Sequence, residues 1–287
     1  HHPNRGSETV VPEQKSPSQS WPSRPFVTNK RVRMNTSKDR LFDLSGRVAL
    51  VTGSGQGMGL GIVRALATQG ARVVINDFYA ERAESSAKAL QAEGLEVCAA
   101  PGDITQASVR EQIVATARET FGEIDILVNN AGVPPGMPGS LRQFKDLADS
   151  DFERQLDLNL RAILGLTRLV VDGMCERKHG RIVIISSESW RLGLSYGLSD
   201  YAAAKAAALG FMRQLSHEVG RSGVTANALS LGCMNNFGYD EVAKAGTAMG
   251  RAGTPEDVGA AVAFLSSDEA SWLTGQVIAL NGGSTTA

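Results

Sequence analysis

The sequence has few cysteines and almost no net charge. The three cysteines, Cys98, Cys175 and Cys233, lie far apart and match neither a disulfide framework nor a paired zinc-ligand spacing. The number and spacing of the cysteines favour a reducing, cytoplasmic location for the protein and predict that it binds no metal. A formal net charge of -1 at pH 7 provides no global positive field to attract nucleic acid or an anionic membrane. The expected partner is therefore a small molecule.

Long apolar runs are also missing. No stretch approaches the roughly 20 consecutive apolar residues that a helix needs to cross a bilayer, and the start lacks the apolar centre of a signal peptide. Residues 1–38 are rich in serine, proline and basic residues, so they predict a flexible arm that is in part a tag remnant. Residues 39–287 are expected to form a single catalytic domain.

Short β-branched runs alternate with longer amphipathic stretches from Arg47 onward. Four of these runs are typical of buried strands, at residues 48–51, 73–75, 126–128 and 182–185. The helical stretches between them close with a glycine, as expected just past a helix C-terminus, at Gly70, Gly94 and Gly122. This rhythm predicts a doubly wound α/β fold of Rossmann type, with about seven parallel strands and helices on both faces. Ligands of such sheets bind beyond the carboxyl ends of the strands.

A glycine-rich turn, residues 53–59, directly follows the first predicted strand and leads into an amphipathic helical stretch. Glycines let the backbone approach a pyrophosphate, whose charge is met by amide hydrogens and the positive end of the helix dipole. The turn therefore predicts a dinucleotide site, and a merely flexible turn is the weaker alternative. The residues expected to contact the dinucleotide are Gly53, Gln56, Gly57, Met58 and Gly59.

The spacing Thr-Gly-x-x-x-Gly-x-Gly resembles that of the short-chain dehydrogenase/reductase family, in its single-domain NAD-type branch. Three further landmarks follow in the family's order, Asn129-Asn130-Ala131-Gly132, Tyr201-Ala202-Ala203-Ala204-Lys205 and the tail motif at residues 250–257. The resemblance covers residues 44–283. It implies an oxidoreductase that transfers a hydride between NAD(H) and a secondary alcohol or ketone, in a homotetramer or homodimer.

Asp77, at the end of the second predicted strand, indicates which dinucleotide binds. A carboxylate there accepts hydrogen bonds from the ribose hydroxyls of NAD, whereas the 2′-phosphate of NADP brings a second anion against it. The glycine-rich turn contains no Arg or Lys to neutralise that phosphate, and Arg82 is the nearest candidate. The predicted cofactor is therefore NAD. An exposed turn aspartate is the alternative interpretation of Asp77.

The resemblance implies further cofactor contacts. In the family, an aspartate after the third strand bonds the adenine edge, and Asp103 holds that position here with Ile104 beside it. Helix capping ahead of Gln106 is the alternative for Asp103. The family's Pro-Gly and threonine after the sixth strand are replaced by Leu231-Gly232 and the longer Asn236. Lys205 is implied to hold the nicotinamide ribose. The implied cofactor contacts also include Phe78, Asn129, Ala131, Gly132, Tyr201, Gly232, Met234 and Asn236.

Tyr201 and Lys205 lie four residues apart, which places both side chains on one face of a helix. A neighbouring ammonium stabilises a phenolate and lowers its pKa, so the pair predicts a proton-transfer centre. The resemblance adds Ser187 to hold the substrate oxygen and Asn159 to anchor a water that leads to Lys205. The alternatives are a strand-end cap for Ser187 and a purely structural amide for Asn159.

The substrate side is defined by fewer residues. Ser187 lies one residue farther from Tyr201 than the family spacing, so Ser189 is an alternative for the catalytic serine. Ser189, Trp190 and Cys233 are predicted to contact substrate. Arg191 is expected either to bind an acidic substrate or to face solvent. Five apolar residues after Tyr201 fit either a subunit contact or the core, namely Ala206, Ala207, Leu209, Phe211 and Met212.

Two alternatives to an NAD-dependent dehydrogenase remain. An NADPH-dependent 3-oxoacyl-type ketoreductase is disfavoured by Asp77. A catalytically idle NAD-binding regulator is disfavoured by the intact set of Ser187, Tyr201 and Lys205.

Overall fold

The structure is a computed structural model that describes residues 40–134, 142–193, 195, 197–235, 238 and 240–286. The predicted N-terminal arm and the predicted cofactor contact Asn236 lie outside the described residues. Within these ranges, no helix combines the length and the apolar character needed to cross a membrane.

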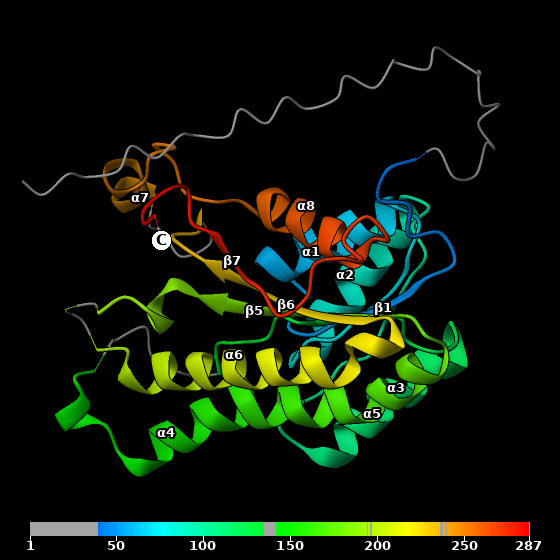
Figure 1. The fold of residues 1–287 in the computed structure, drawn as a ribbon, viewed down its shortest axis with the longest axis horizontal. Coiled ribbons are helices and arrows are strands. Elements are labelled where there is room, and N and C mark those ends of the chain that lie inside the picture. The colour runs from blue at the N-terminus through cyan, green and yellow to red at the C-terminus, as the bar shows by residue number, and fades with distance from the viewer. Residues whose placement is uncertain are drawn as a thin grey trace, which may run out of the picture. The chain divides into compact units, whose positions relative to one another are not determined.

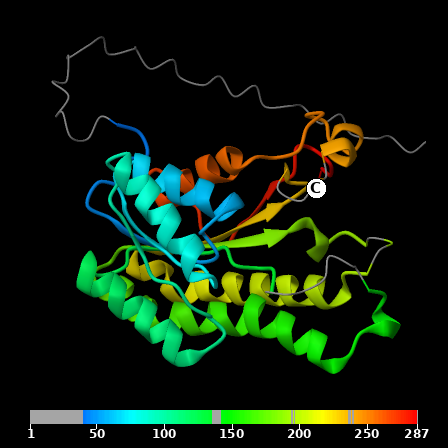
Figure 2. The same cartoon turned by 180° about the vertical axis from the view of Figure 1, so that it is seen from behind.

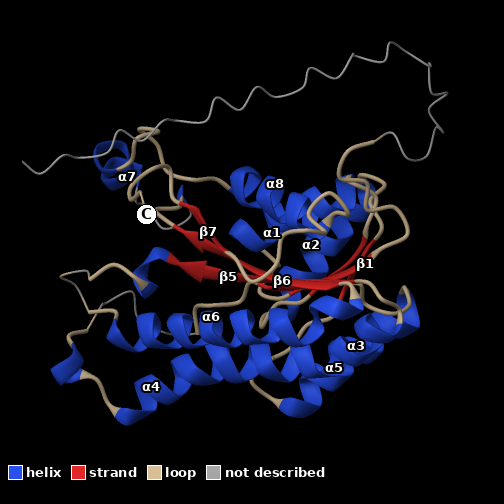
Figure 3. Cartoon of the chain, in the orientation of Figure 1, coloured by secondary structure: helices blue, strands red, loops and turns tan. Residues whose placement is uncertain are grey.

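A seven-stranded parallel sheet forms the centre of the fold (Figure 3). The strands are β1 (Val48–Val51), β2 (Arg72–Ile75), β3 (Val97–Ala99), β4 (Ile126–Asn129), β5 (Gly180–Ser187), β6 (Val224–Leu231) and β7 (Val277–Leu280). Their order is β3-β2-β1-β4-β5-β6-β7, so the winding reverses at β1. Ligands of doubly wound sheets bind at this reversal, beyond the carboxyl ends of the strands. The predicted fold class is confirmed.

Helices cover both faces of the sheet (Figures 1 and 2). One face carries α1 (Gly57–Thr68), α2 (Ala80–Ala92) and α8 (Pro255–Ser266). The other carries α3 (Ala107–Thr120), α4 (Asp149–Leu156), α5 (Ala162–Glu176) and α6 (Ser199–Val219), and a short helix, α7 (Asp240–Gly246), precedes α8. Each face has its own apolar cluster, because alternate strand residues point to opposite sides. In β1, Val51 packs into the cluster on the face covered by α1, α2 and α8, and Leu50 packs into the cluster on the other face.

The apolar residues of α6 mostly belong to the core of the chain itself. Leu209 and Met212 are fully buried in the cluster beneath α6, and Phe211 packs against that cluster. Ala207 is exposed and Ala206 is half-buried. Helix α6 therefore presses its apolar side onto the sheet, and this packing positions the residues at its N-terminal end.

Candidate active site

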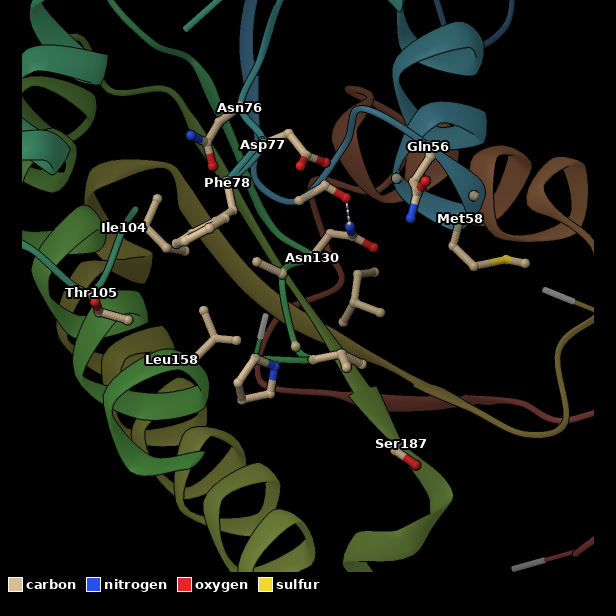
Figure 4. Close-up of a pocket in the computed structure, with 18 of the residues that line it drawn as sticks. Gln56, Met58, Asn76, Asp77, Phe78, Ile104, Thr105, Asn130, Leu158 and Ser187 are labelled. Atoms are coloured by element: carbon tan, nitrogen blue, oxygen red, sulfur yellow. Dashed lines mark hydrogen bonds between the residues drawn. The ribbon is translucent and has the colours of Figure 1, made fainter. Parts of the chain in front are cut away.

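A cavity of about 920 Å³ opens at the carboxyl ends of the strands. It extends from the end of β2, past the turn between β1 and α1, to the end of β5 and the start of α6 (Figure 4). It is lined by most of the predicted site residues, namely Gly53, Gln56, Gly57, Met58, Gly59, Asp77, Phe78, Asp103, Ile104, Ala131, Gly132, Ser187, Tyr201, Lys205, Gly232 and Met234. Residues predicted from seven separate segments thus meet around one cavity.

Asn130 holds the glycine-rich turn in place. Its side-chain nitrogen donates hydrogen bonds to the main-chain oxygens of Thr52, at 2.9 Å, and Gly53, at 2.8 Å (Figure 4). A Cβ atom on Gly53 would lie 2.8 Å from the Cα of Ala131, and one on Gly59 would lie 2.7 Å from the Asn130 nitrogen. Both positions therefore require glycine, and the turn stays open in front of the N-terminus of α1.

Asp77 is 6% exposed, so it is not the exposed turn aspartate considered above. Its Oδ2 accepts a hydrogen bond from the amide of Gly55 at 3.0 Å, and its Oδ1 accepts one from the amide of Tyr79 at 3.1 Å. Each carboxylate oxygen keeps a further lone pair that can accept a hydroxyl. The guanidinium of Arg82, which also lines the cavity, stacks over the Tyr79 ring at 4.2 Å.

Phe78 and Ile104 form an apolar wall next to Asp77, and their side chains lie beside each other in Figure 4. Asp103 accepts hydrogen bonds from the amide and the hydroxyl of Thr105, at 2.9 and 2.8 Å. The N-cap of α3 is Gln106, so Asp103 closes the turn ahead of the helix rather than capping it. Its carboxylate both shapes this turn and lines the cavity.

Asn129 and Asn130 have different positions. Asn129 is buried at the end of β4 and does not line the cavity, whereas Asn130 lines it and supports the glycine-rich turn. Sequence reasoning assigned the contact to Asn129, although strand alternation could have separated the two side chains. It also missed other lining residues, namely Asn76, Tyr79, Gly102, Thr105, Val133, Pro134, Arg154, Asp157, Leu158, Ile185, Ser186 and Leu231.

Tyr201 and Ser187 meet at the far end of the cavity from Asp77. Burial raises the pKa of the Tyr201 phenol to about 12, and a hydrogen bond with the Ser187 side chain offsets part of this rise. The direction is the reverse of the lowering expected from the neighbouring ammonium, because desolvation is the largest influence on this phenol. The Ser187 hydroxyl oxygen also accepts a hydrogen bond from the amide of Ser189 at 3.3 Å. Ser187, rather than Ser189, is thus the serine in contact with Tyr201.

Lys205 is 2% exposed and lies one helical turn after Tyr201. Its Nζ donates a hydrogen bond to the main-chain oxygen of Ile185 at 2.8 Å and lies 5.5 Å from the centre of the Tyr201 ring. Burial lowers the pKa of Lys205 to about 8. At pH 7 the side chain remains mostly protonated, so it places a positive charge next to the phenol.

Asn159 is fully buried in a π-helical turn, Asp157–Arg161, between α4 and α5. Its amide nitrogen donates to the main-chain oxygen of Gly132 at 3.1 Å and to Gln155, while its Oδ1 accepts no hydrogen bond from the described residues. A Cβ atom on Gly132 would lie 2.8 Å from Lys205 Nζ and 3.3 Å from Asn159 Oδ1. The ammonium and the amide oxygen therefore border the same small polar space.

The predicted substrate contacts do not line this cavity. Trp190 donates from its indole nitrogen to the hydroxyl of Ser230 at 3.1 Å, and Ser189 is buried in the same turn. Cys233 accepts a hydrogen bond from the amide of Gly253 through its main-chain oxygen. The substrate roles of these residues stay predictions. Arg191 is ion-paired with Glu188 at 2.7 Å and is partly exposed, and its substrate role also stays a prediction.

A family model described as short chain dehydrogenase matches residues 47–244. The chain belongs to this family. An acetoacetyl-CoA reductase of Allochromatium vinosum is 36% identical over 246 residues, covering 83% of this chain and 98% of that protein. A hydroxy(phenyl)methylsuccinyl-CoA dehydrogenase subunit of Thauera aromatica is 36% identical over 247 residues, covering 84% and 97%. Both relatives align along nearly their whole length.

Solved structures of dehydrogenases have the same fold. A putative gluconate dehydrogenase from Agrobacterium tumefaciens superposes with a TM-score of 0.79 at 30% identity, covering 86% of this chain and 98% of that one. A gluconate 5-dehydrogenase from Burkholderia cenocepacia, solved with NADP and tartrate, has a TM-score of 0.77 at 30% identity and the same coverage. The short-chain dehydrogenase described here is accordingly an oxidoreductase of a family that binds a nicotinamide cofactor.

The residues around the cavity fit such a cofactor. The glycine-rich turn leaves room for a ligand at the N-terminus of α1, where amide hydrogens and the helix dipole favour a pyrophosphate. The buried Asn159 Oδ1 still has acceptor capacity beside Lys205.

Proposed function

We propose that this short-chain dehydrogenase uses NAD(H) to interconvert a secondary alcohol and a ketone, with Tyr201 as the proton-transfer residue. The observation that carries the proposal is a single cavity with Asp77 at one end and the contact between Ser187 and Tyr201 at the other. A dinucleotide is an elongated molecule, and this cavity offers ribose recognition and acid/base chemistry at opposite ends. Fold alone would not support this conclusion, because function depends on the site.

At the end of the cavity proposed to bind adenosine, Asp77 is the residue that favours NAD over NADP. Both of its oxygens are held by main-chain amides, so the carboxylate is oriented before any ligand arrives. Charge-assisted hydrogen bonds from the ribose hydroxyls would favour NAD by roughly 1.5 to 3 kcal/mol. Asp103, Phe78 and Ile104 would enclose the adenine. The glycine-rich turn would hold the pyrophosphate.

Proton transfer is assigned to Tyr201 with two supporting groups. The Ser187 hydroxyl would hold the substrate oxygen while that oxygen loses or gains a proton at the phenol of Tyr201. Lys205 would favour the phenolate through its positive charge. The bound nicotinamide supplies the hydride acceptor or donor and, when oxidised, a second positive charge beside the phenol. Asn159 Oδ1 would hold a water that exchanges protons with Lys205.

NADP is the alternative cofactor, and one observation favours it. Arg82 lines the cavity at the adenosine end and stacks on Tyr79, so its guanidinium lies near the place where a 2′-phosphate would bind. The gluconate 5-dehydrogenase named above was solved with NADP. Against this, the buried Asp77 carboxylate would face a dianion.

We also propose a cytoplasmic homodimer or homotetramer. Trp272, between α8 and β7, is 99% exposed, and Phe264 on α8 is exposed as well. Large exposed apolar side chains favour a subunit contact. Size-exclusion chromatography with light scattering at micromolar concentration would measure the oligomeric state. A wild-type protein that elutes as a monomer, at the same volume as Trp272→Ser, would refute the proposed subunit contact.

The decisive experiment is a panel of alcohols and ketones, including gluconate and acetoacetyl-CoA, assayed with all four nicotinamide cofactors at the nicotinamide absorbance. We expect turnover of at least one secondary alcohol or ketone, with NAD(H) preferred over NADP(H). Tight NADH binding without turnover of any compound would favour a regulator. Preferred use of NADPH would favour the ketoreductase alternative and overturn the assignment based on Asp77.

A further inference from the structure

A buried polar cluster lies directly behind the catalytic serine and joins it to the C-terminal part of the chain. We propose that the C-terminal turn, residues 281–285, is a clamp in which Asn281 and Thr285 position Ser187 through the carboxylate of Glu188. This inference rests on the proposed function for its kinetic consequence. The clamp itself is a contact that can be tested without any substrate.

Glu188 follows Ser187 in the chain and is 5% exposed. Its Oε2 accepts hydrogen bonds from the Asn281 side-chain nitrogen at 2.9 Å and the Thr285 hydroxyl at 2.7 Å. Arg191 donates to the same oxygen through Nη2 at 2.7 Å and Nε at 3.1 Å. Two of these three partners come from a segment more than ninety residues farther along the chain. The C-terminal turn therefore tethers the turn that begins at Ser187.

The cluster retains a negative charge at its centre. Burial acts to raise the pKa of Glu188, but the interactions of its carboxylate with Ser230, Arg191, Asn281 and Thr285 outweigh it and hold that pKa below its usual value. The other oxygen of this carboxylate, Oε1, accepts no hydrogen bond from the described residues, so the donors to Oε2 hold the buried charge and loss of one of them should force the turn to rearrange. The cluster lies outside the cavity lining, but its central residue, Glu188, is the chain neighbour of Ser187, which does line the cavity.

Asn281 also contacts the loop after β6, beside the end of β5. A Cβ atom on Gly232 would lie 2.8 Å from the Cα of Asn281, and the Gly232 amide donates to the main-chain oxygen of Leu280 at 3.1 Å. Gly232 lines the cavity and directly follows Leu231, the β6 residue that pairs with Ser187. One residue of the clamp thus touches both the loop after β6 and the carboxylate behind the serine.

The same turn also contacts the segment that follows α7. The amide of Met249 donates to the main-chain oxygen of Gly282 at 3.0 Å, and a Cβ atom on Gly283 would lie 2.8 Å from the Cβ of Ala248. The C-terminal turn therefore connects three segments that are distant in sequence, those at Glu188, Gly232 and Ala248. Catalytic groups tolerate little misplacement, since a shift of about 1 Å can cost on the order of 10²-fold in rate.

The test uses Thr285→Val, which keeps the shape of the side chain. It removes the hydroxyl that donates to Glu188 and accepts from Arg191 and Asn281. The matched control is Thr286→Val, the same change at the next, exposed position. Thr285→Ser restores the hydroxyl and should rescue the defect. Hydrogen–deuterium exchange of the peptide that covers residues 182–193 reports on the clamp directly. We expect faster exchange in Thr285→Val and wild-type exchange in both Thr286→Val and Thr285→Ser.

The kinetic arm uses gluconate or acetoacetyl-CoA as the probe, whichever the wild-type enzyme turns over. We expect kcat to fall at least about fivefold in Thr285→Val, because Ser187 is displaced, while KM for the nicotinamide cofactor changes less than about twofold. Combining Thr285→Val with Glu188→Gln should add no further loss, since both changes act through one carboxylate.

Two results would overturn the clamp. One is identical exchange in Thr285→Val and Thr286→Val. The other is a fall in kcat matched by an equal rise in cofactor KM and a lower melting temperature, which would indicate general loosening of the fold. If the wild-type enzyme turns over neither probe, the exchange experiment alone decides the clamp, and the panel of alcohols decides the proposed function.

Discussion

The Nζ atom of Lys205 donates a 2.8 Å hydrogen bond to the main-chain oxygen of Ile185. This bond ties α6 to β5, the two elements that carry Tyr201 and Ser187. The ammonium is thus held by the protein itself, in a buried position, before any ligand is bound. Burial disfavours the charged form of Lys205 and lowers the pKa of its ammonium group to about 8.

This lowered pKa predicts a pH dependence of stability for the ligand-free protein. With a folded pKa of about 8 and an unfolded value of 10.5, Lys205 binds more protons in the unfolded chain between these pH values. Its contribution to the free energy of unfolding should therefore increase as the pH rises from 8 to 10.5, by up to ~3 kcal/mol. Urea unfolding of wild type and Lys205→Met across this range would measure it.

The exposed Lys244→Met variant controls for the loss of one positive charge. A difference between wild type and Lys205→Met that stays constant from pH 7 to pH 10 would show that Lys205 keeps an ordinary pKa in the fold.

Replacing Tyr201 with Phe should separate chemistry from binding. The phenol is the proposed proton carrier, and general acid/base catalysis is typically worth 10²- to 10⁴-fold, so turnover should fall at least ~10²-fold. NADH affinity, measured by fluorescence titration, should stay within a few-fold of wild type. A Tyr201→Phe enzyme with more than a tenth of the wild-type kcat would assign proton transfer to another group.

Cofactor choice should depend on the charge of Asp77. Two unit charges about 4 Å apart repel by roughly 4 kcal/mol at an effective dielectric of 20, and solvent reduces this, so a preference for NAD of at least ~100-fold in kcat/KM is expected. Asp77→Asn keeps the shape and removes the charge. It should lower NAD efficiency and raise NADP efficiency.

Asp103→Asn is the matched control for Asp77→Asn, because it removes the other predicted cofactor carboxylate that lines the cavity. It should affect both cofactors alike, since Asp103 is assigned to the adenine that they share. Equal changes in NAD and NADP efficiency in both variants would assign selectivity elsewhere, first of all to Arg82.

A pair of glycine variants tests the shape of the cofactor turn. A Cβ atom on Gly59 would collide with the main-chain oxygen of Gly53, whereas one on Gly210, on the exposed side of α6, meets nothing within 4 Å. Gly59→Ala should weaken NADH binding at least ~tenfold, or about 1.4 kcal/mol. Gly210→Ala should leave NADH affinity unchanged and stabilise the fold by about 0.5–1 kcal/mol. Equal NADH affinities in the two variants would contradict the proposed role of the turn.

Local patterns in the sequence were enough for the class of fold and for the residues of the glycine-rich turn. The runs at 48–51 and 126–128 form strands because β-branched residues buried on both faces suit a parallel sheet. The four-residue spacing of Tyr201 and Lys205 placed them on one helix face, and the structure has both lining the cavity. These features depend on neighbours along the chain or on one repeating period.

Contacts between distant segments were decided only by the tertiary structure. Asn130, rather than Asn129, faces the cavity because the end of β4 is oriented by its pairing with β1 and β5. Two partners of Glu188, Asn281 and Thr285, come from the other end of the chain, and Arg191 joins the same cluster through its ion pair with Glu188. No periodicity encodes such contacts. They arise when packing brings charged side chains out of water, so that each buried charge must find partners wherever the fold supplies them.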